Sequence, residues 1–395
     1  MVKTLQLDEE KLEAVRVVLA GLGRPWTPQD VADALKDVGM VVSDAAVLLT
    51  VEELKRTSMG VGRLEPLLEL PGLTDIIVDG PGRVLVDCGH GLRATEVKFD
   101  SDAQVRQLAV RLAASVGRRL DDSSPYADAR LADGIRFHAV LSPISAPGTC
   151  ISLRVPSRAG FTLENWVENG SISHATAELL RRIVSKKVAF LISGGTGSGK
   201  TTLLAGLLGI VPQNERILIV EDSRELEPEH DFCVRLESRP ANSEGAGAVT
   251  MTDLVRQALR MRPDRVVVGE IRGAELCDLL RALNTGHEGG CGTVHANSAV
   301  DVPARLEALA ALGGLSRQAC NSQVASAIQV VIHVKRLASG RRQVAQIGLL
   351  RPRQDGMVEV VPALEAAASD PSRLKPRAAY AQLVELLDLP RVAAA

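Results

Sequence analysis

The chain has 395 residues, which is long enough for two or three domains. Its composition, 46% hydrophobic and 24% charged, is typical of a soluble globular protein. Its formal net charge of −2 argues against a broad basic surface for nucleic acid, and its 2% of aromatic residues argues against widespread stacking on bases. The N-terminus has no apolar signal segment, and no run approaches the roughly 18 apolar residues of a membrane span. We therefore expect a cytoplasmic protein that contacts a membrane only through partners.

Residues 1–58 predict an N-terminal helical bundle. LDEEKLEAVRVVLAGLG has apolar residues at helical spacing and ends at glycines. TPQDVADALKDVG begins with Thr27, a good N-cap, and has Pro28 at the first helical position. SDAAVLLTVEELKRTSMG gives a third helical stretch.

Residues 60–155 predict an α+β domain. LTDIIVDGPGRVLVDCG reads as two short strands around a turn, DAQVRQLAVRLAASVG as a helix, and RLADGIRFHAVLSP and GTCISLRVP as two further strands. Residues 156–172 carry turn residues and are expected to be a linker.

Residues 173–350 predict an open α/β sheet, because strands alternate with helices there. The runs VAFLIS, ILIVED and RVVVGE are typical of buried parallel strands. Near the C-terminus, VAQIGLL and MVEVVPAL resemble strands, and a helix is expected around RAAYAQLVELL. Residues 351–395 are expected to form a C-terminal extension.

The stretch GGTGSGKTT fits the phosphate-loop pattern G-x4-G-K-[ST], between a predicted strand and a predicted helix. Glycines allow the tight turn in which backbone N–H groups face phosphates, and the helix N-terminus adds partial positive charge. Lys200 would reach the β- and γ-phosphates of ATP, and the Thr201 hydroxyl would bind Mg2+. The expected nucleotide-binding residues are Gly194, Gly195, Thr196, Gly197, Ser198, Gly199, Lys200, Thr201 and Thr202.

Two strand ends after the phosphate loop supply carboxylates, at the edge where open α/β sheets bind ligands. ILIVEDSREL places Glu221 there, and RVVVGEIRG places Glu270, with Gly269 where an aspartate is common. We expect Glu221 to be the general base for the attacking water and Glu270 to coordinate Mg2+ through water. The two roles could be exchanged.

Four blocks in order, GGTGSGKTT, IVEDSREL, VVVGEIRG and LNTGHEGGCGTVHAN, resemble the Walker A, Asp, Walker B and His boxes of the type II/type IV secretion ATPases. LVRQALRMRPDRVVVGEIRGAE and DARLADGIRFHAVL look most like the branch that drives tight-adherence (Flp) pili. The resemblance covers roughly residues 60–350. It implies a RecA-like P-loop domain, a smaller PAS-like α+β domain, and a homo-hexameric ATPase.

The stretch LNTGHEGGCGTVHAN raises the alternative of a metal site, because His287, Cys291 and His295 are spaced H-x3-C-x3-H. Its glycines argue against the helix that would align three ligands. The resemblance implies instead that both histidines act near the nucleotide. We therefore expect Cys291 to fill a small packed position.

The resemblance also implies that the N-terminal domain lends arginines to the active site. The candidates are Arg130, Arg136 and Arg154, of which Arg136 and Arg154 are expected to be catalytic. Arg272 fits the G-E-x-R run of the family. Other arginines, including Arg118, Arg119, Arg341 and Arg342, are expected to be solvated surface charges.

Three functions are compatible with these features. The first is a hexameric ATPase motor that assembles a pilus or drives secretion at the inner membrane by moving an integral membrane platform protein. The second is a conjugation-type or DNA-transfer ATPase of the same superfamily, which predicts a basic channel and salt-sensitive DNA affinity. The third is a nucleotide-gated scaffold without turnover, which would require one of the four boxes to be broken.

Overall fold

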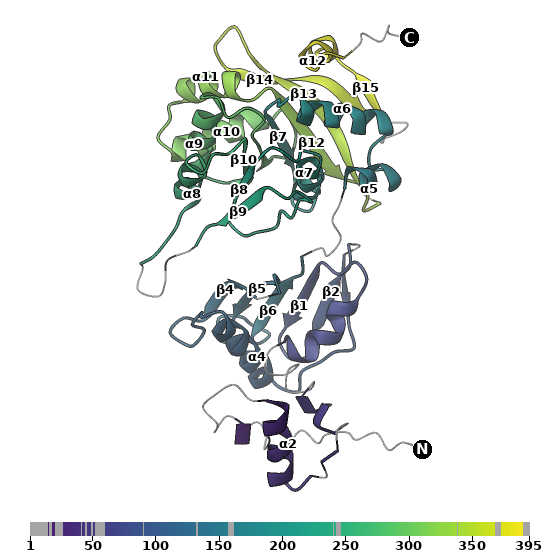
Figure 1. The fold of residues 1–395 in the computed structure, drawn as a ribbon, viewed down its shortest axis with the longest axis vertical. Coiled ribbons are helices and arrows are strands. Elements are labelled where there is room, and N and C mark those ends of the chain that lie inside the picture. Colours follow the sequence, from purple (N-terminus) through teal and green to yellow (C-terminus); the bar gives the residue numbers. More distant parts are fainter. Residues whose placement is uncertain are drawn as a thin grey trace. The chain divides into compact units, whose positions relative to one another are not determined.

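The computed structural model describes Val15, Val18, Leu19 and residues 27–389, except 41, 44–45, 49, 52–59, 90, 132, 157–161, 240, 242–245, 338 and 368–372. The chain divides into two compact units, Met1–Ser157 and Arg158–Ala395 (Figure 1). Within the described part, every helix is too short or too polar to cross a membrane.

The predicted N-terminal helix at Thr27 is confirmed as α2 (Pro28–Asp37). Thr27 caps it: its hydroxyl accepts the N–H of Asp30, whose carboxylate accepts the N–H of Thr27 at 2.7 Å. Both other predicted helices fall largely outside the described residues. A small core surrounds α2, formed by Val15, Leu19, Val31, Ala34, Leu35 and Val51.

The first unit also contains a six-stranded antiparallel sheet in the order β3-β2-β1-β6-β5-β4. Its elements are η1 (Gly62–Glu69), β1 (Asp75–Asp79), β2 (Val84–Asp87), β3 (Leu92–Ala94), α4 (Asp102–Ser115), β4 (Tyr126–Arg130), β5 (Arg136–Val140) and β6 (Cys150–Arg154). Apolar residues of η1 and α4 pack with every second residue of β5 and β6 in one core, so the other face of these strands carries the polar residues. The first unit combines helices with an antiparallel sheet, in keeping with the α+β prediction, although β3 and β4 were not predicted.

The second unit is built on a nine-stranded sheet in the order β15-β14-β13-β12-β7-β11-β10-β8-β9. Strands β12, β7, β11, β10, β8 and β9 run parallel, which confirms the predicted open α/β sheet. Its strands are β7 (Phe190–Gly194), β8 (Ile217–Glu221), β9 (Cys233–Glu237), β10 (Arg265–Ile271), β11 (Cys291–His295), β12 (Val330–Arg336), β13 (Arg342–Pro352), β14 (Val358–Ala366) and β15 (Leu374–Pro376).

Helices cover both faces of this sheet (Figure 1). They are α5 (Leu163–Glu168), α6 (His174–Ser185), α7 (Lys200–Gly209), α8 (Met251–Ala258), α9 (Glu275–Leu283), α10 (Val302–Leu312), α11 (Arg317–Ala327) and α12 (Tyr380–Leu386). Successive strand residues point to opposite faces. Phe190 and Ile192 therefore join the core under α5, α6, α7 and α12, whereas Leu191 joins the core under α8 to α11.

Two predicted boundaries were wrong. The linker expected at 156–172 contains α5, whose first turn is capped by the Thr162 hydroxyl and which buries Leu163 and Trp166 in the main core. The extension expected at 351–395 is not separate from the α/β domain. Strand β13 crosses position 351 and pairs antiparallel with β12 and β14, so the C-terminal strands extend the same sheet.

Candidate nucleotide-binding and catalytic site

The phosphate loop connects the buried strand β7 to α7, as the sequence predicts. A Cβ at Gly194 would lie 2.4 Å from the Val334 carbonyl oxygen and 2.5 Å from the Ser198 hydroxyl, so only glycine fits there. Gly199 has a φ of 96°, a left-handed conformation that favours glycine. The loop therefore has the tight turn that exposes backbone N–H groups at a helix N-terminus.

Lys200 is folded over this loop. Its ammonium donates to the carbonyl oxygens of Gly194 and Gly195, at 3.1 and 3.0 Å, and the residue is 9% exposed. Burial lowers the pKa of Lys200, and the negative charge of Glu270 opposes that shift. A buried ammonium at a helix N-terminus fits a phosphate ligand. Thr201, half-buried on the first turn of α7, is the hydroxyl that would hold Mg2+.

Around Lys200 the other predicted loop residues differ in exposure. Ser198 is buried, Thr202 is half-buried, and Thr196 and Gly197 are exposed. The loop therefore combines a buried inner wall with an exposed outer rim.

Glu221, at the carboxyl end of β8, is almost completely buried, with 3% exposure. Its Oε1 accepts the backbone N–H groups of Glu225 and Leu226, both at 2.9 Å. Its Oε2 is buried and has no hydrogen-bond partner among the described residues. Burial raises the pKa of Glu221 to about 7. The hydrogen bonds from the two backbone N–H groups lower this pKa, but burial has the larger effect.

The glycine before Glu270 has a physical cause that the sequence did not reveal. A Cβ at Gly269 would lie 2.6 Å from Glu221 Cγ, so the missing side chain makes room for the buried glutamate on the neighbouring strand. The carbonyl oxygen of Gly269 accepts a hydrogen bond from the Thr293 hydroxyl at 2.7 Å. Strand β10 is thereby fixed between β8 and β11.

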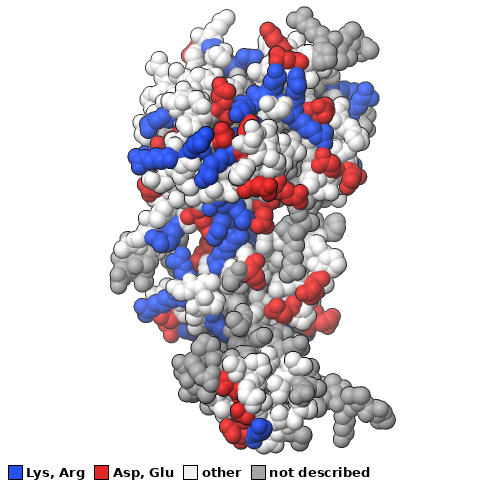
Figure 2. Space-filling model, viewed as in Figure 1, with Lys and Arg blue, Asp and Glu red and all other residues white. Residues whose placement is uncertain are grey.

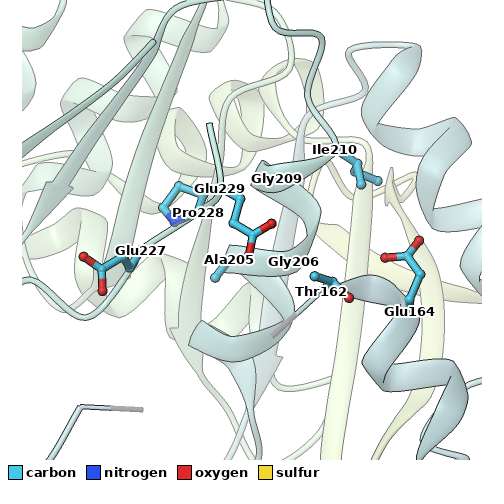
Figure 3. Close-up of a pocket in the computed structure, with 9 residues that line it drawn as sticks. All are labelled: Thr162, Glu164, Ala205, Gly206, Gly209, Ile210, Glu227, Pro228 and Glu229. Carbon is cyan, nitrogen blue, oxygen red and sulfur yellow. The ribbon is translucent and has the colours of Figure 1, made fainter. Parts of the chain in front are cut away.

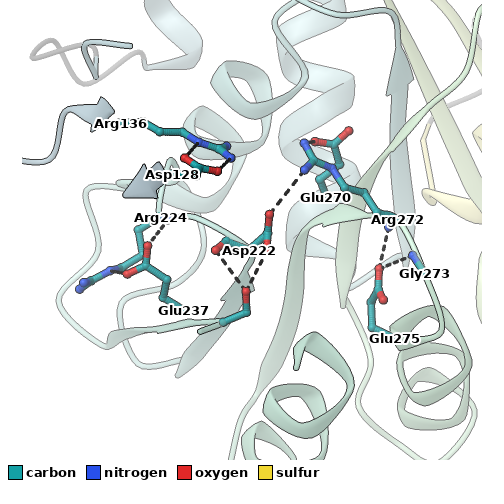
Figure 4. A network of polar contacts seen from close by, with 10 residues as sticks. Asp128, Arg136, Asp222, Arg224, Glu237, Glu270, Arg272, Gly273 and Glu275 are labelled. Carbon is teal, nitrogen blue, oxygen red and sulfur yellow. Dashed lines mark hydrogen bonds and ion pairs between the residues drawn. The ribbon is translucent and has the colours of Figure 1, made fainter. Parts of the chain in front are cut away.

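Glu270 is more open than Glu221, with its side chain 31% exposed. Arg272 links two carboxylates, since it lies 2.5 Å from Glu270 and 3.5 Å from Asp222 (Figure 4). The backbone N–H of Arg272 donates to Glu275 at 2.6 Å, which fixes the turn after β10. In the sheet, β10 lies two strands from β7, and β8 lies three strands from it. Of the two predicted carboxylates, Glu270 is therefore the nearer to the phosphate loop.

The two predicted histidines lie at opposite ends of β11. His295 pairs with Gly194 in the parallel register of β11 and β7, which places it at the phosphate loop. His287 precedes the amino end of that strand, and its Nδ1 lies 3.3 Å from the Ala282 carbonyl oxygen. Four strand steps alone separate the ends by about 13 Å. The register therefore places His295, and not His287, at the phosphate loop of the same chain, and the catalytic role of both histidines stays a prediction.

Cys291 lies between them as a core residue. It is 1% exposed, packs in the core under α7, and burial raises its pKa to about 12. The predicted packed position for Cys291 is confirmed. The metal alternative also required a helix, whereas Cys291 and His295 belong to a strand.

A buried histidine behind the loop was missed from the sequence. His333, on β12, is 2% exposed, and its Nδ1 lies 2.9 Å from the hydroxyl of Ser193, the residue before Gly194. Burial lowers the pKa of His333 to about 4, so its imidazole is neutral at pH 7. The rear wall of the loop is therefore polar but uncharged at this position. Only the run of hydrophobic residues around His333 signalled a buried strand.

The predicted arginines of the first unit form a row on its sheet. In the antiparallel register, Arg130 pairs with Arg136, Arg136 with Arg154, and Arg154 with Asp75. Arg136 also forms an ion pair with Asp128 at 2.8 Å (Figure 4). The strands alternate, so the row lies on the polar face. Opposed like charges are unfavourable, and the carboxylate of Asp128 offsets part of this repulsion.

A pocket of about 150 Å3 lies along α7 (Figure 3). Its floor includes Gly206 and Gly209, and its rim carries the carboxylates of Glu164, Glu227 and Glu229. The nine residues that line the pocket include no lysine or arginine that could compensate the charge of a polyphosphate. The pocket is therefore unsuited to the phosphates of a nucleotide, in contrast to the phosphate loop.

Known proteins share this arrangement. Residues 57–385 match the model of the family described as "Type II/IV secretion system protein". A putative conjugal transfer protein of Mycobacterium tuberculosis is 52% identical over 327 residues, 81% of this chain and 93% of that protein. The conjugal transfer protein TrbB of Rhizobium radiobacter is 30% identical over 275 residues, 68% of this chain and 81% of that protein.

Solved structures agree on the fold. The pilus retraction motor PilT with bound ADP has a TM-score of 0.51 at 20% identity, covering 82% of this chain and 85% of its own. The ATPase DotB of Legionella pneumophila has a TM-score of 0.51 at 21% identity, covering 74% and 80%. The described chain has the α/β fold of these proteins, and it belongs to the type II/IV secretion system protein family.

Proposed function

We propose that this protein is an ATP-hydrolysing motor subunit of a secretion or pilus-assembly machine. The observation that carries the proposal is the buried ammonium of Lys200 at the phosphate loop, with the carboxylate of Glu270 within electrostatic reach of it. Phosphoryl transfer to water requires positive charge on the phosphates and a base beside the attacking water. Lys200 can supply the positive charge, and Glu270, on the neighbouring part of the sheet at the end of β10, can supply the base.

We assign the base to Glu270, which the sequence analysis expected to coordinate Mg2+, and we give Glu221 neither the base nor the Mg2+ role. Glu270 is 31% exposed and can meet a water molecule, whereas Glu221 is 3% exposed and its Oε1 is held by two backbone N–H groups. Glu221 acts as a positioning residue through its contact with Gly269. Mg2+ would be held by Thr201, with phosphate oxygens and waters as its remaining ligands.

Assembly into a homo-hexameric ring is part of the proposal. The row of Arg130, Arg136 and Arg154 supports a role in compensating phosphate charge during turnover, as the family resemblance implies. The partner in the membrane would be an integral platform protein of the machine. The protein itself would work in the cytoplasm, at the inner face of the membrane.

The cargo admits two candidates. Assembly of a tight-adherence pilus is supported by the motif resemblance alone. Conjugal transfer is supported by the similarity to conjugal transfer proteins, one of them 52% identical. Direct DNA contact by this subunit is disfavoured by its net charge of −2 and by the basic and acidic side chains interspersed on the visible face of the second unit (Figure 2).

The test of the proposal is ATP hydrolysis by the purified full-length chain, compared with its Lys200→Ala variant. Wild type should release phosphate from Mg-ATP, and the variant should lose turnover and bind ATP more weakly, because the ammonium at the phosphates is gone. Equal phosphate release by both proteins would overturn the phosphate-loop assignment. The absence of any turnover in the wild type, with ATP still bound, would favour a nucleotide-gated scaffold.

A further inference from the structure

The hairpin between β12 and β13 lies against the phosphate loop. Strand β12 runs parallel to β7, so its carboxyl end and the following turn are at the loop's edge of the sheet. Arg336 and Arg342 pair directly across this hairpin. A Cβ at Gly199 would lie 2.7 Å from Arg342 Cδ, and one at Gly197 would lie 4.0 Å from Arg336 Nη1. Two arginines therefore flank the two central glycines of the loop.

The surroundings of Arg342 favour a bound anion. Directly opposed like charges on neighbouring strands are destabilising. Arg342 is half-buried, and burial together with the charge of Arg336 lowers its pKa. Within the described part of the chain, Arg342 forms no ion pair with a carboxylate. A cation in such surroundings is stabilised by a bound anion.

The opposite flank of the loop carries a carboxylate as well as an arginine. There, on the β10 side, Glu270 and Arg272 are the strongest charges acting on Lys200. A carboxylate belongs beside the γ-phosphate, where water attacks, but it would repel the rest of the polyphosphate. The α- and β-phosphates should therefore extend toward the flank that has arginines instead of carboxylates.

We propose that Arg336 and Arg342 form a second anion site of the phosphate loop, which binds the α- and β-phosphates that ATP and ADP share. This inference rests on the proposed function, because it requires a nucleotide in the loop. It reverses the expectation that Arg342 is a solvated surface charge. The pair retains the nucleotide after hydrolysis, whereas Lys200 reaches the β- and γ-phosphates and Glu270 acts at the γ-phosphate.

The test measures binding rather than turnover. ADP, a non-hydrolysable ATP analogue and inorganic pyrophosphate are titrated by calorimetry against full-length wild type, Arg342→Ala, Arg342→Lys and Arg341→Ala. Arg341 is the adjacent exposed arginine, so Arg341→Ala controls for the loss of one positive charge on the same hairpin.

Arg342→Ala should weaken all three ligands together, by about 10- to 100-fold for the loss of a charge-assisted hydrogen bond. Arg342→Lys should restore part of that loss, which a purely structural role would not predict, and Arg341→Ala should match wild type. If Arg342→Ala does not fold, the more exposed Arg336→Ala should show the same uniform loss.

Three results would overturn the inference. Unchanged affinity for all ligands would show that the pair does not contact nucleotide. A loss confined to the ATP analogue would place it at the γ-phosphate, and a loss for ADP but not pyrophosphate would place it at the ribose or base. If wild type itself binds no nucleotide, the proposed function fails as well, whereas normal binding by both wild type and Arg342→Ala rejects only this inference.

Discussion

The buried carboxylate of Glu221 should make the protein less stable as the pH rises. Its pKa is about 7 in the folded chain, against 4.5 for an unperturbed glutamate. Between these values the folded state binds more protons than the unfolded state, so the free energy of unfolding falls with increasing pH. This contribution is fully present below about pH 4.5 and is lost as the pH passes through about 7.

The magnitude follows from the two pKa values. A shift of one unit corresponds to about 1.4 kcal/mol, so the two values give a loss on the order of 2 kcal/mol between about pH 5.5 and about pH 8. Glu221→Gln keeps the size and the hydrogen bonds to Glu225 and Leu226 but cannot ionise. Its free energy of unfolding should therefore rise relative to wild type by about that amount across this range.

Urea unfolding of wild type and Glu221→Gln at several pH values measures the difference, since all other titrating groups are shared. Glu359→Gln, on exposed β14 surface, controls for the replacement of a carboxylate on the same sheet. A difference between wild type and Glu221→Gln that is constant with pH would refute the claim that Glu221 is buried with a raised pKa.

Three further substitutions probe the site. Gly269→Ala should lower the free energy of unfolding by about 1 to 3 kcal/mol, because its methyl group overpacks against Glu221, and it should also slow ATP turnover. Gly82→Ala, where the added Cβ meets open space, should change neither quantity. Urea unfolding and phosphate release measure the two effects, and a fully active, stable Gly269→Ala would contradict the packing argument. Arg136→Ala and Arg154→Ala should cut turnover, by up to about 10³-fold if they act as trans arginines, while ADP affinity by calorimetry is spared. Unchanged turnover in both variants would remove the arginine row from the catalytic site.

The sequence predicted the parts of the site that have a strict local pattern. GGTGSGKTT requires a strand before it and a helix after it, and both are present. The carboxylates of Glu221 and Glu270 follow buried apolar strands, so their common edge of the sheet could be predicted.

The remaining features depend on contacts between distant segments. The fit of Gly269 against Glu221 involves residues 48 positions apart on neighbouring strands, which no spacing rule records. The sequence predicts Arg342 to be a surface charge. Its contact with Gly199 arises from the tertiary pairing of the β12–β13 hairpin, which a local sequence pattern does not show. Similarly, only the register of β11 shows where His287 lies. A motif gives the order of residues along the chain, but it does not show at which end of the sheet each residue is placed.

The central claim is that this loop hydrolyses ATP with Glu270 as the base. The direct measurement is phosphate release from Mg-ATP by wild type, Glu270→Gln and Glu221→Gln, with ATP affinity measured on the same preparations. Glu270→Gln should release phosphate about 10²- to 10⁴-fold more slowly than wild type while still binding ATP, and Glu221→Gln should be affected less. Near-normal phosphate release by Glu270→Gln, with the large loss in Glu221→Gln instead, would contradict the assignment.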